Sequence, residues 1–581
     1  MKLLKRIAMV TLSLLMALST FVMSACDDGS TTDDTQEAID SSRTQIYVYN
    51  YNGGYGSEWL AGVKRRFEAL HADKSYEEGK MGVQIYVNAQ KTTFNSMTST
   101  ILTSNDEVFF GEQGFYNTLK KGGILADITD VVSTPLTEYG ETRSIVDKLS
   151  NEQKSFYGLE ENGETHYYAL PHYLSNFGFI YNVDLFDELG YYVKKGTSDE
   201  NAVFIKKSKG AVSLGPDGKT GVIDGIDYTE DDGLPATYAE FFALCDLMVE
   251  DGVVPVSWCG NAYGEYLNSL RVALASEAMG LEEMMLNYTL RGTSKTLATV
   301  DVNGKITSLG ETQILPSSAY KLAQQEGWYY ALSFLERLTM TANYHNTLAY
   351  NGAYSHIDAQ EDFINAGLDG RTQEMGMLMD GTWWESEATS AYDRMVQGMG
   401  DKYAKIKRNF KMMPLPKPTQ AHVQVAAASA KPYTRYSEHA PLCFIRANAP
   451  SWKMDLLKEF MRFVHTDVSL REFTTTTNSM RAFDYTLTED DLNGMTTFGK
   501  SLVTMKTKAE FVYPYSSDPG YTANESAYAS SAYLSKGIVN GKSYSGWFNA
   551  FKDYSISPED YFAGIYNYSP ANPIVPLSGT I

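Results

Sequence analysis

The side chains best suited to binding chemistry form the run Asp380-Gly381-Thr382-Trp383-Trp384. Adjacent residues on a strand face opposite ways, so we expect one of the two indoles to pack in the core. The other indole can then offer its flat apolar face to a ligand. Asp380 could accept charge-assisted hydrogen bonds from ligand hydroxyl groups, or it could equally fix the turn. The run therefore predicts an aromatic face beside a hydrogen-bond acceptor.

A glycine-rich break lies between two tyrosines closer to the N-terminus. Tyr51 and Tyr55 flank Gly53 and Gly54, directly after a β-rich run. Glycine loops at strand ends can hold phosphate groups, but this one lacks GxGxxG spacing and a following Lys-Ser or Lys-Thr pair. We therefore interpret it as a turn at the rim of a binding site and not as a nucleotide site.

The histidines and cysteines do not indicate a metal site. The eight histidines include no HxxxH or HxH pair. Cys245, Cys259 and Cys443 lie far apart without CxxC spacing, and three cysteines cannot all pair with one another. Cys245 lies in a helical apolar pattern, which favours buried free thiols, although a single disulfide stays open. We expect no metal and no cofactor.

Length and charge bound the class of protein. The chain has 581 residues, enough for two lobes, because single cores stop growing at roughly 250–300 residues. Its 71 acidic residues outnumber 49 basic ones, which gives a formal net charge of −22. This balance argues against nucleic acid as a partner and against a polybasic membrane surface. The 41 tyrosines favour an aromatic-rich binding protein.

The N-terminus has the pattern of an export signal. A basic start and an uncharged apolar stretch over 7–23 end in the run MSAC, whose last residue is Cys26. This run resembles the bacterial lipoprotein box, with Met where Leu is usual, and the alternative is ordinary secretion. We expect a signal peptide over 1–25, a lipid on Cys26 and a polar tether over 26–43. No later run reaches the roughly 18–20 apolar residues of a membrane span.

Strand and helix patterns alternate in the first part of the chain. Runs typical of strands lie at 46–51, 83–88 and 107–113, and each precedes a helical pattern. Ser57 is expected to cap the first helix, over 58–70. Its buried face should hold Trp59, Val63, Phe67 and Leu70. The order predicts an α/β lobe with a parallel sheet, in which ligands bind at the carboxyl ends of the strands.

Later segments continue the alternation. Turn signals over 192–234 indicate an inserted hairpin. A helix should begin after the capping residue Thr237 and end near Gly252. A strand over 441–450 and an amphipathic helix over 452–466 follow towards the C-terminus. The whole pattern belongs to the α/β class.

The order of these blocks resembles the extracellular solute-binding proteins of ATP-driven importers, in the sugar-binding family that includes maltose-binding protein. The resemblance runs from about Gln45 to the C-terminus, although the insert over 192–234 and the tail after Phe483 depart from smaller members. Its marks, in chain order, are FYNTLKKGGILADITDVV, YYALPHYLSNFGFIYNVDLFDELG, PATYAEFFALCDLMVEDGVVPV, EMGMLMDGTWWESEA and KEFMRFVHTDVSLREFTTTTNSMRAF.

The resemblance implies a two-lobed periplasmic-binding-protein fold, type II-like, with a hinge between the lobes. Lobe 1 would hold 44–173 and about 436–485, and lobe 2 about 174–435 and about 486–581. An oligosaccharide would bind between the lobes, and the closed form would dock on permease subunits driven by an ATPase. Such a protein is a receptor and not an enzyme. We expect a monomer, lipid-anchored to the outer face of the bacterial cytoplasmic membrane.

The resemblance also implies site residues. In this family a tryptophan after the small-residue turn stacks on a sugar ring, because a pyranose has an apolar C–H face. Trp383 is the first choice for this contact and Trp384 the second. Other ligand contacts would come from strand ends, from the lobe crossings and from the tail. They are Asp380, Trp258, Tyr263, Tyr173, Ser175, Asn176, Glu112, Gln113, Tyr51, Tyr55 and Tyr515. Asn176 can both donate and accept hydrogen bonds, or it could cap a turn.

Three other classes of protein are alternatives to a sugar receptor. A glycan-active enzyme needs two carboxyls about 5–10 Å apart, for which Glu112, Asp380 and Glu385 are candidates, but no segment resembles a hydrolase. A receptor for a peptide or polyamine is the main alternative, and a polyamine would favour an acidic aromatic box. The tandem tryptophans and many tyrosines favour carbohydrate, and the length suggests an oligosaccharide. A purely structural lipoprotein fits the hinged pattern poorly.

Overall fold

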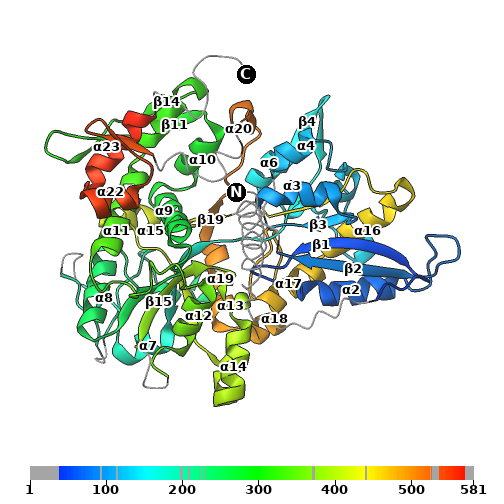
Figure 1. Ribbon diagram of the computed structural model, residues 1–581, viewed down its shortest axis with the longest axis horizontal. Coiled ribbons are helices and arrows are strands. Elements are labelled where there is room, and N and C mark those ends of the chain that lie inside the picture. Colours follow the sequence, from blue (N-terminus) through cyan, green and yellow to red (C-terminus); the bar gives the residue numbers. More distant parts are fainter. Residues whose placement is uncertain are drawn as a thin grey trace, which may run out of the picture.

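Figure 1 shows two lobes side by side in the computed structural model. The structure describes residues 38–91, 94–112, 115–196, 201–206, 210–220, 222–223, 226–227, 229–368, 373–438, 441–523, 525 and 536–569. Each lobe has its own sheet with helices packed around it. None of the helices in these ranges has the length and apolarity that a membrane crossing requires.

The sheet of lobe 1 has the order β2-β1-β3-β18-β6. β1 (Thr44–Tyr51) pairs in parallel with β2 (Val83–Gln90) and with β3 (Val108–Phe110). This confirms the parallel arrangement predicted for the first strands. β18 (Leu442–Ile445) then lies antiparallel to β3, and β6 (Leu170–Pro171) borders it, so the whole sheet is mixed.

The remaining elements of lobe 1 surround this sheet. They are α2 (Trp59–Leu70), α3 (Phe94–Thr103), α4 (Tyr116–Lys121), α5 (Thr129–Ser133), α6 (Asn151–Tyr157), β4 (Gly158–Glu161), β5 (Glu164–Tyr167), α16 (Met454–Val464) and α17 (Asp467–Thr477). The amphipathic pattern of α16 buries Leu456, Phe460 and Val464, as its spacing predicted.

Helix α2 departs from its sequence pattern at both ends. Trp59, Val63 and Phe67 are buried as expected, but Leu70 at the end of the helix is 46% exposed. Ser57 does not cap the helix, since Glu58 occupies the N-cap position and no side chain accepts a hydrogen bond there. The helix is thus held by packing of its middle turns and not by its ends.

The sheet of lobe 2 has the order β10-β15-β7-β16. β10 (Val254–Ser257) and β15 (Met375–Gly381) are parallel, whereas β7 (Phe177–Asn182) runs antiparallel to β15 and to β16 (Phe410–Met413). All seven residues of β15 are buried. The carboxyl end of β15 therefore carries the run that begins at Asp380 to one edge of this sheet.

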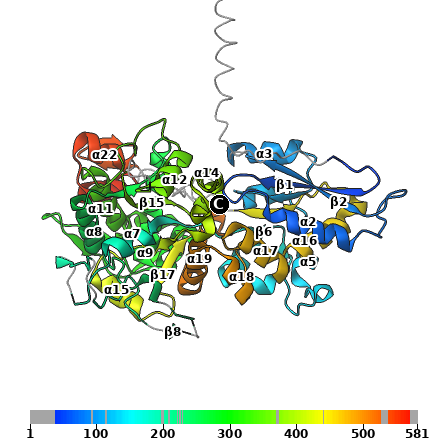
Figure 2. The same ribbon diagram turned by 90° about the horizontal axis from the view of Figure 1, so that it is seen from below.

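Helices cover both faces of the lobe 2 sheet, and small hairpins lie at its periphery (Figures 1 and 2). Its helices are α7 (Val183–Leu189), α8 (Tyr238–Glu250), α9 (Tyr263–Met279), α10 (Leu281–Thr289), α11 (Glu326–Met340), α12 (His356–Asn365), α13 (Trp384–Glu387), α14 (Thr389–Met399), α15 (Gln420–Ala427) and α19 (Thr497–Lys508). The small strands are β8 (Val222–Ile223), β9 (Ile226–Asp227), β11 (Gly292–Ser294), β12 (Ala298–Val300), β13 (Ile306–Ser308) and β14 (Thr312–Ile314). Thr237 caps α8 by accepting a hydrogen bond from the Glu240 backbone, as predicted.

The chain crosses between the lobes after β6, after β17 (Tyr433–Tyr436) and after α17. β17 pairs in parallel with β19 (Ala509–Val512), next to the crossings. In Figure 2, β17 and α19 lie near the middle of the molecule, next to β6 at the border of the lobe 1 sheet. Several chain crossings that lie close together can act as one hinge.

The tail contacts both lobes, although the sequence assigned it to lobe 2 alone. The buried Glu525 carboxylate accepts hydrogen bonds from Asn117 and Thr118 of lobe 1 at 3.0–3.3 Å. Asp518 forms an ion pair of 2.9 Å with Arg291 of lobe 2. Between them, α20 (Pro519–Ala523) lies at the top of Figure 1 between α10 and α4.

The last elements return to lobe 2. They are β20 (Gly537–Val539), β21 (Lys542–Tyr544), α22 (Trp547–Tyr554) and α23 (Pro558–Tyr568). α23 packs against β20 and α11. α18 (Glu489–Gly494) lies between α17 and α19 along the chain.

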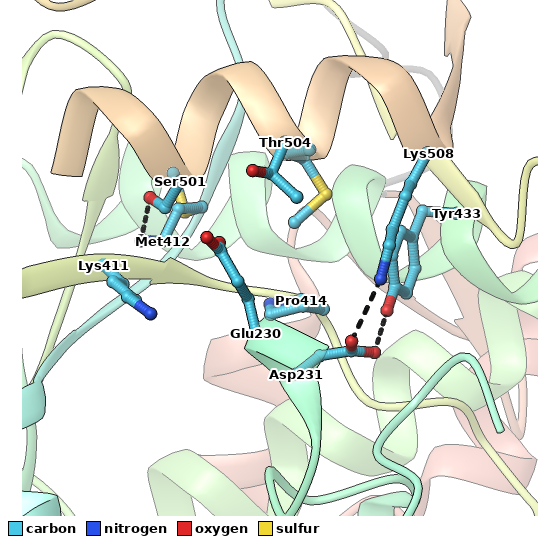
Figure 3. Close-up of a pocket in the computed structure, with 10 residues that line it drawn as sticks. Glu230, Asp231, Lys411, Met412, Pro414, Tyr433, Ser501, Thr504 and Lys508 are labelled. Carbon is cyan, nitrogen blue, oxygen red and sulfur yellow. Dashed lines mark hydrogen bonds and ion pairs between the residues drawn. The ribbon is translucent and has the colours of Figure 1, made fainter. Parts of the chain in front are cut away.

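Buried charges fasten the insert of lobe 2 to α19. Lys508 lies 3.3 Å from Asp217 and 3.2 Å from Asp231, and all three side chains are buried. Figure 3 shows Lys508 and Tyr433 both pointing at Asp231, whose carboxylate accepts a hydrogen bond from the Tyr433 hydroxyl. The cavity beside them is about 20 Å³, room for a single water molecule. This cluster is structural.

The cysteines are as predicted. Cys245, Cys259 and Cys443 are buried free thiols, each inside a lobe. Burial raises the pKa of the Cys259 thiol to about 11, so it stays protonated and unreactive at neutral pH. Cys26 lies outside the described residues.

Candidate functional site

The carboxyl ends of three strands meet the lobe crossing between β6 and β7. Tyr51 ends β1, Glu112 follows β3, and Asp380 lies at the end of β15. We call the residues gathered here the interlobe junction: Tyr51, Gly54, Tyr55, Glu112, Tyr173, Asn176, Phe177, Tyr266, Gln360, Asp380, Thr382, Trp383 and Glu387. The junction therefore lies where ligands bind in α/β sheets.

Trp383 lies at the centre of the interlobe junction. It is half-buried, and its indole lies over Gly381, where an added Cβ would come within 2.3 Å of the ring. Phe177 supports the indole with a ring separation of 6.3 Å. On the lobe 1 side, a Cβ on Gly54 would lie 3.3 Å from the Trp383 Cβ, and Gly54 has a φ of +56°. Both the close approach and the backbone conformation favour glycine there.

Direct contacts join the two lobes beside Trp383. The Tyr55 and Thr382 hydroxyls are 2.7 Å apart, and the Gly54 N–H donates to the Glu387 carboxylate at 3.1 Å. Tyr55 also packs edge-on against Tyr173, at a ring separation of 4.7 Å. Tyr55 and Tyr173 are buried by these contacts, so they form the inner wall of the junction.

Two carboxyls share one amide in this region. The Gln360 amide nitrogen donates to Asp380 at 3.0 Å and to Glu387 at 3.1 Å. Burial raises the pKa of Asp380 to about 8, and the negative charge of the nearby Glu387 carboxylate contributes to this rise. Asp380 also accepts a hydrogen bond of 2.7 Å from the Gly381 N–H. The turn-fixing role that the sequence left open for Asp380 is therefore present.

Lobe 1 contributes a tyrosine–glutamate pair. Tyr51 folds back so that an added Cβ on Gly53 would lie 2.5 Å from its ring. Its hydroxyl bonds the Glu112 carboxylate, while burial raises the pKa of Glu112 to about 7. Both side chains stay half-buried. The junction thus offers aromatic faces and hydrogen-bond acceptors from both lobes.

Two predicted tryptophans lie elsewhere, so these predictions are wrong for this structure. Trp384 is fully buried against Phe363, Phe410 and Phe498 in the lobe 2 core. It is the inward-facing member of the tandem pair. Trp258 is also fully buried, and its indole N–H donates to the Ala349 carbonyl at 2.8 Å.

Other predicted residues are buried with partners of their own. The Ser175 hydroxyl donates to the Glu438 carbonyl, so in this structure Ser175 is buried and braces a lobe crossing. Tyr515 lies in the tail against Phe156 of lobe 1, at 5.0 Å. Tyr263 is half-buried, but its ring contacts are Tyr350 and Phe548 within lobe 2. These positions do not meet at the interlobe junction.

Three further predicted positions have different outcomes. Asn176 bonds Thr382 through its backbone, and its side-chain oxygen is buried without a partner. Gln113 lies outside the described residues, so its role stays a prediction. Glu385, the third carboxyl weighed for hydrolysis, is buried in lobe 2 and accepts a hydrogen bond from Thr496 at 2.8 Å.

Sequence reasoning missed Tyr266, Gln360 and Glu387. Tyr266 packs against Phe177 at 5.3 Å and is half-buried. Helical spacing held a weak signal for two of them, because Tyr266 follows Tyr263 by one turn and Glu387 follows Trp383 by one turn. Gln360 lies on α12, on a different element from Asp380 and Glu387. Nothing in the sequence around it indicates a role at the junction.

Another surface pocket lies on lobe 2. Its volume is about 260 Å³, and charged residues of both signs line it, with Tyr403 as its aromatic residue. Asp184, Lys402 and Arg408 are among them. It lacks the paired aromatic faces of the interlobe junction. In the described ranges, no three His, Cys, Asp or Glu side chains gather as a metal site would require.

The comparisons with known proteins agree with this architecture. Neither a protein-family model nor a curated protein sequence matches the chain. A solved chitin oligosaccharide binding protein superposes with a TM-score of 0.52 at 14% identity, covering 91% of this chain and 99% of its own. A structure from work on xylan utilization by the thermophilic bacterium Caldanaerobius polysaccharolyticus gives a TM-score of 0.51 at 12% identity, covering 90% and 99%. The two-lobed fold predicted from the sequence is confirmed.

Proposed function

We propose that this protein is the substrate-binding receptor of an ATP-driven sugar importer and holds an oligosaccharide between its lobes. One observation carries the proposal: half-buried aromatic side chains from both lobes, Tyr51, Tyr266 and Trp383, lie at one junction beside acceptor carboxyls. An aromatic face suits the apolar side of a pyranose, and carboxylates accept hydrogen bonds from its hydroxyl groups.

The structural neighbours support the ligand class. They share the fold over nearly their whole length, and they are a chitin oligosaccharide binding protein and a protein from work on xylan utilization. The contacts between the lobes at the junction also suit a receptor that opens and closes around a hinge, because each is a single hydrogen bond that can separate. We propose that the lobes open by separation of the Tyr55–Thr382 and Gly54–Glu387 contacts.

We propose binding without catalysis. Hydrolysis needs one carboxyl as acid and a second as nucleophile or base, both open to the sugar. Of the three candidates, Asp380 and Glu385 are enclosed and hydrogen-bonded inside lobe 2, and only Glu112 is half-buried. Incubation with oligosaccharides followed by product analysis tests this: we expect intact sugars, and shortened sugars would show an enzyme.

A thermal-shift screen tests the sugar ligand. The body from Gln45 onward is mixed with oligosaccharides of several linkages and lengths, with spermidine and short peptides as controls. A ligand that binds only the folded protein stabilises it by about 2.7 kcal/mol at a hundredfold excess over Kd. We expect one sugar series to raise the melting temperature selectively. A shift with peptides alone would contradict the sugar ligand.

We further propose that Cys26 carries a lipid that anchors the mature protein to the outer face of the cytoplasmic membrane, where permease subunits and their ATPase would receive the sugar. The support is the MSAC run after an apolar stretch. Cys26→Ser should move the protein from the membrane fraction to the medium in cell fractionation. A variant that remained membrane-bound would contradict the lipid anchor.

A further inference from the structure

The interlobe junction has more hydrogen-bond acceptors than donors. Glu112, Asp380 and Glu387 bring three carboxyls to it. Gln360 places its amide between Asp380 and Glu387, and the oxygen of that amide is buried without a partner among the described residues. The side-chain oxygen of Asn176 is also buried without a hydrogen-bond partner among the described residues. A buried acceptor without a donor costs free energy, which a ligand that supplies donors would recover.

Positive charge is scarce at the same place. Lys91 acts on Glu112 electrostatically, but within the described ranges no lysine, arginine or histidine forms an ion pair with Asp380 or Glu387. Glu438 and Glu387 both add negative charge near Asp380 and help to raise its pKa. Burial and these neighbouring carboxylates therefore raise the pKa of Asp380 to about 8, so Asp380 stays protonated near neutral pH.

Some buried carboxyls elsewhere in this chain have lysine partners. Glu277 is paired with Lys417 inside lobe 2, and both side chains are nearly inaccessible. Glu107 is paired with Lys453 at 2.7 Å inside lobe 1. Asp231 is paired with Lys508 beside the insert. These pairs show one way in which the fold neutralises enclosed acids. Glu283 and Glu525 instead accept hydrogen bonds from neutral groups, as Asp380 and Glu387 do.

We propose that the ligand supplies the missing cation: an amino sugar whose primary ammonium group binds at the Glu387 carboxylate, beside Trp383. This inference rests on the proposed sugar-binding function and narrows its ligand class. Glu387 lies one helical turn after Trp383, and its backbone N–H donates to the Trp383 carbonyl at 3.1 Å. An ammonium group there would contact the carboxylate and the indole face together, and both attract cations.

Paired ligands test the charge directly. Isothermal titration at about pH 6.5, where a sugar amine is protonated, compares glucosamine and galactosamine oligosaccharides with their N-acetylated counterparts, which keep the ring but lose the charge. We expect the amine forms to bind at least about tenfold more tightly. Glu387→Gln should abolish most of this preference, measured as the ratio of the two Kd values within the same variant, so that a general loss of sugar affinity cancels. Glu250→Gln, which removes an exposed carboxylate at the end of α8, is the matched control and should change neither.

The outcomes separate this inference from the function on which it rests. Equal or tighter binding of the N-acetylated or neutral sugars would overturn the amino-sugar inference and leave the sugar receptor standing. Binding of spermidine without any sugar would overturn the sugar receptor and assign the ammonium site to a polyamine. A preference for amines that survives Glu387→Gln would also contradict the inference, because it places the ammonium group elsewhere.

Discussion

Replacing Trp383 by alanine should weaken sugar binding by about 2–4 kcal/mol, the loss typical of a truncated aromatic anchor in an interface. The indole is half-buried at the interlobe junction, lies over Gly381 and faces Gly54 of the other lobe. Its removal takes away the apolar face without opening the lobe 2 core. Isothermal titration with the sugar found by thermal shift measures the change, which amounts to roughly 30- to 1,000-fold in Kd.

A second tryptophan provides the matched control. Trp452 is 52% exposed in lobe 1 and lies outside the junction. Trp452→Ala should bind the sugar with wild-type affinity, so a general effect of removing an indole can be recognised. Unchanged affinity in Trp383→Ala would show that Trp383 does not contact the ligand, and the proposed site would then be wrong.

Replacing Trp384 by alanine should have the opposite profile. Its ring is fully buried against Phe363, Phe410 and Phe498, so truncation leaves a cavity and costs about 3–5 kcal/mol of unfolding free energy. Denaturant unfolding, followed by the fluorescence of the remaining tryptophans, measures this loss. We expect the surviving folded fraction to bind sugar, because the residue makes no part of the junction.

The comparison of these neighbouring variants separates stability from binding. Trp383→Ala should keep the wild-type denaturation midpoint, and Trp384→Ala should lower it clearly. If Trp384→Ala left the midpoint unchanged and abolished binding, the assignment of the two indoles to surface and core would be reversed.

Local patterns predicted most elements of the fold. The β-rich runs at 46–51 and 83–88 became β1 and β2, and the Thr237 cap and α16 lie where their patterns placed them. Local sequence patterns predicted the ends of helices and strands less well than their positions. Ser57 failed as a cap and Leu70 is exposed, because packing of the middle turns determines where α2 begins and stops.

The residue types in the sequence predicted the chemistry of the site, but they predicted less well which residues lie at the interlobe junction. Trp258 and Trp384 have the side chains of a sugar site, but both are buried in the core of lobe 2. Burial depends on which elements pack against a strand, and local sequence does not contain that. Gln360 enters the junction from α12 for the same reason: its partners Asp380 and Glu387 come from other elements.

The tail is the part of the fold that sequence reasoning could place least well. The hydrogen bonds that Asn117 and Thr118 donate to the Glu525 carboxylate join residues about four hundred positions apart in the chain. Such contacts have no periodic signature, since they involve single side chains on irregular segments. The structure therefore shows a connection between the lobes beyond the crossings that the resemblance implied.

A crystal structure of the protein with its sugar tests most directly whether an oligosaccharide binds at the interlobe junction. We expect electron density for an unbroken sugar at the interlobe junction, with one ring on the Trp383 indole and hydroxyl or amino groups at Glu387 and Glu112. Density in the lobe 2 pocket near Lys402, or at the junction without contact to Trp383, would contradict it.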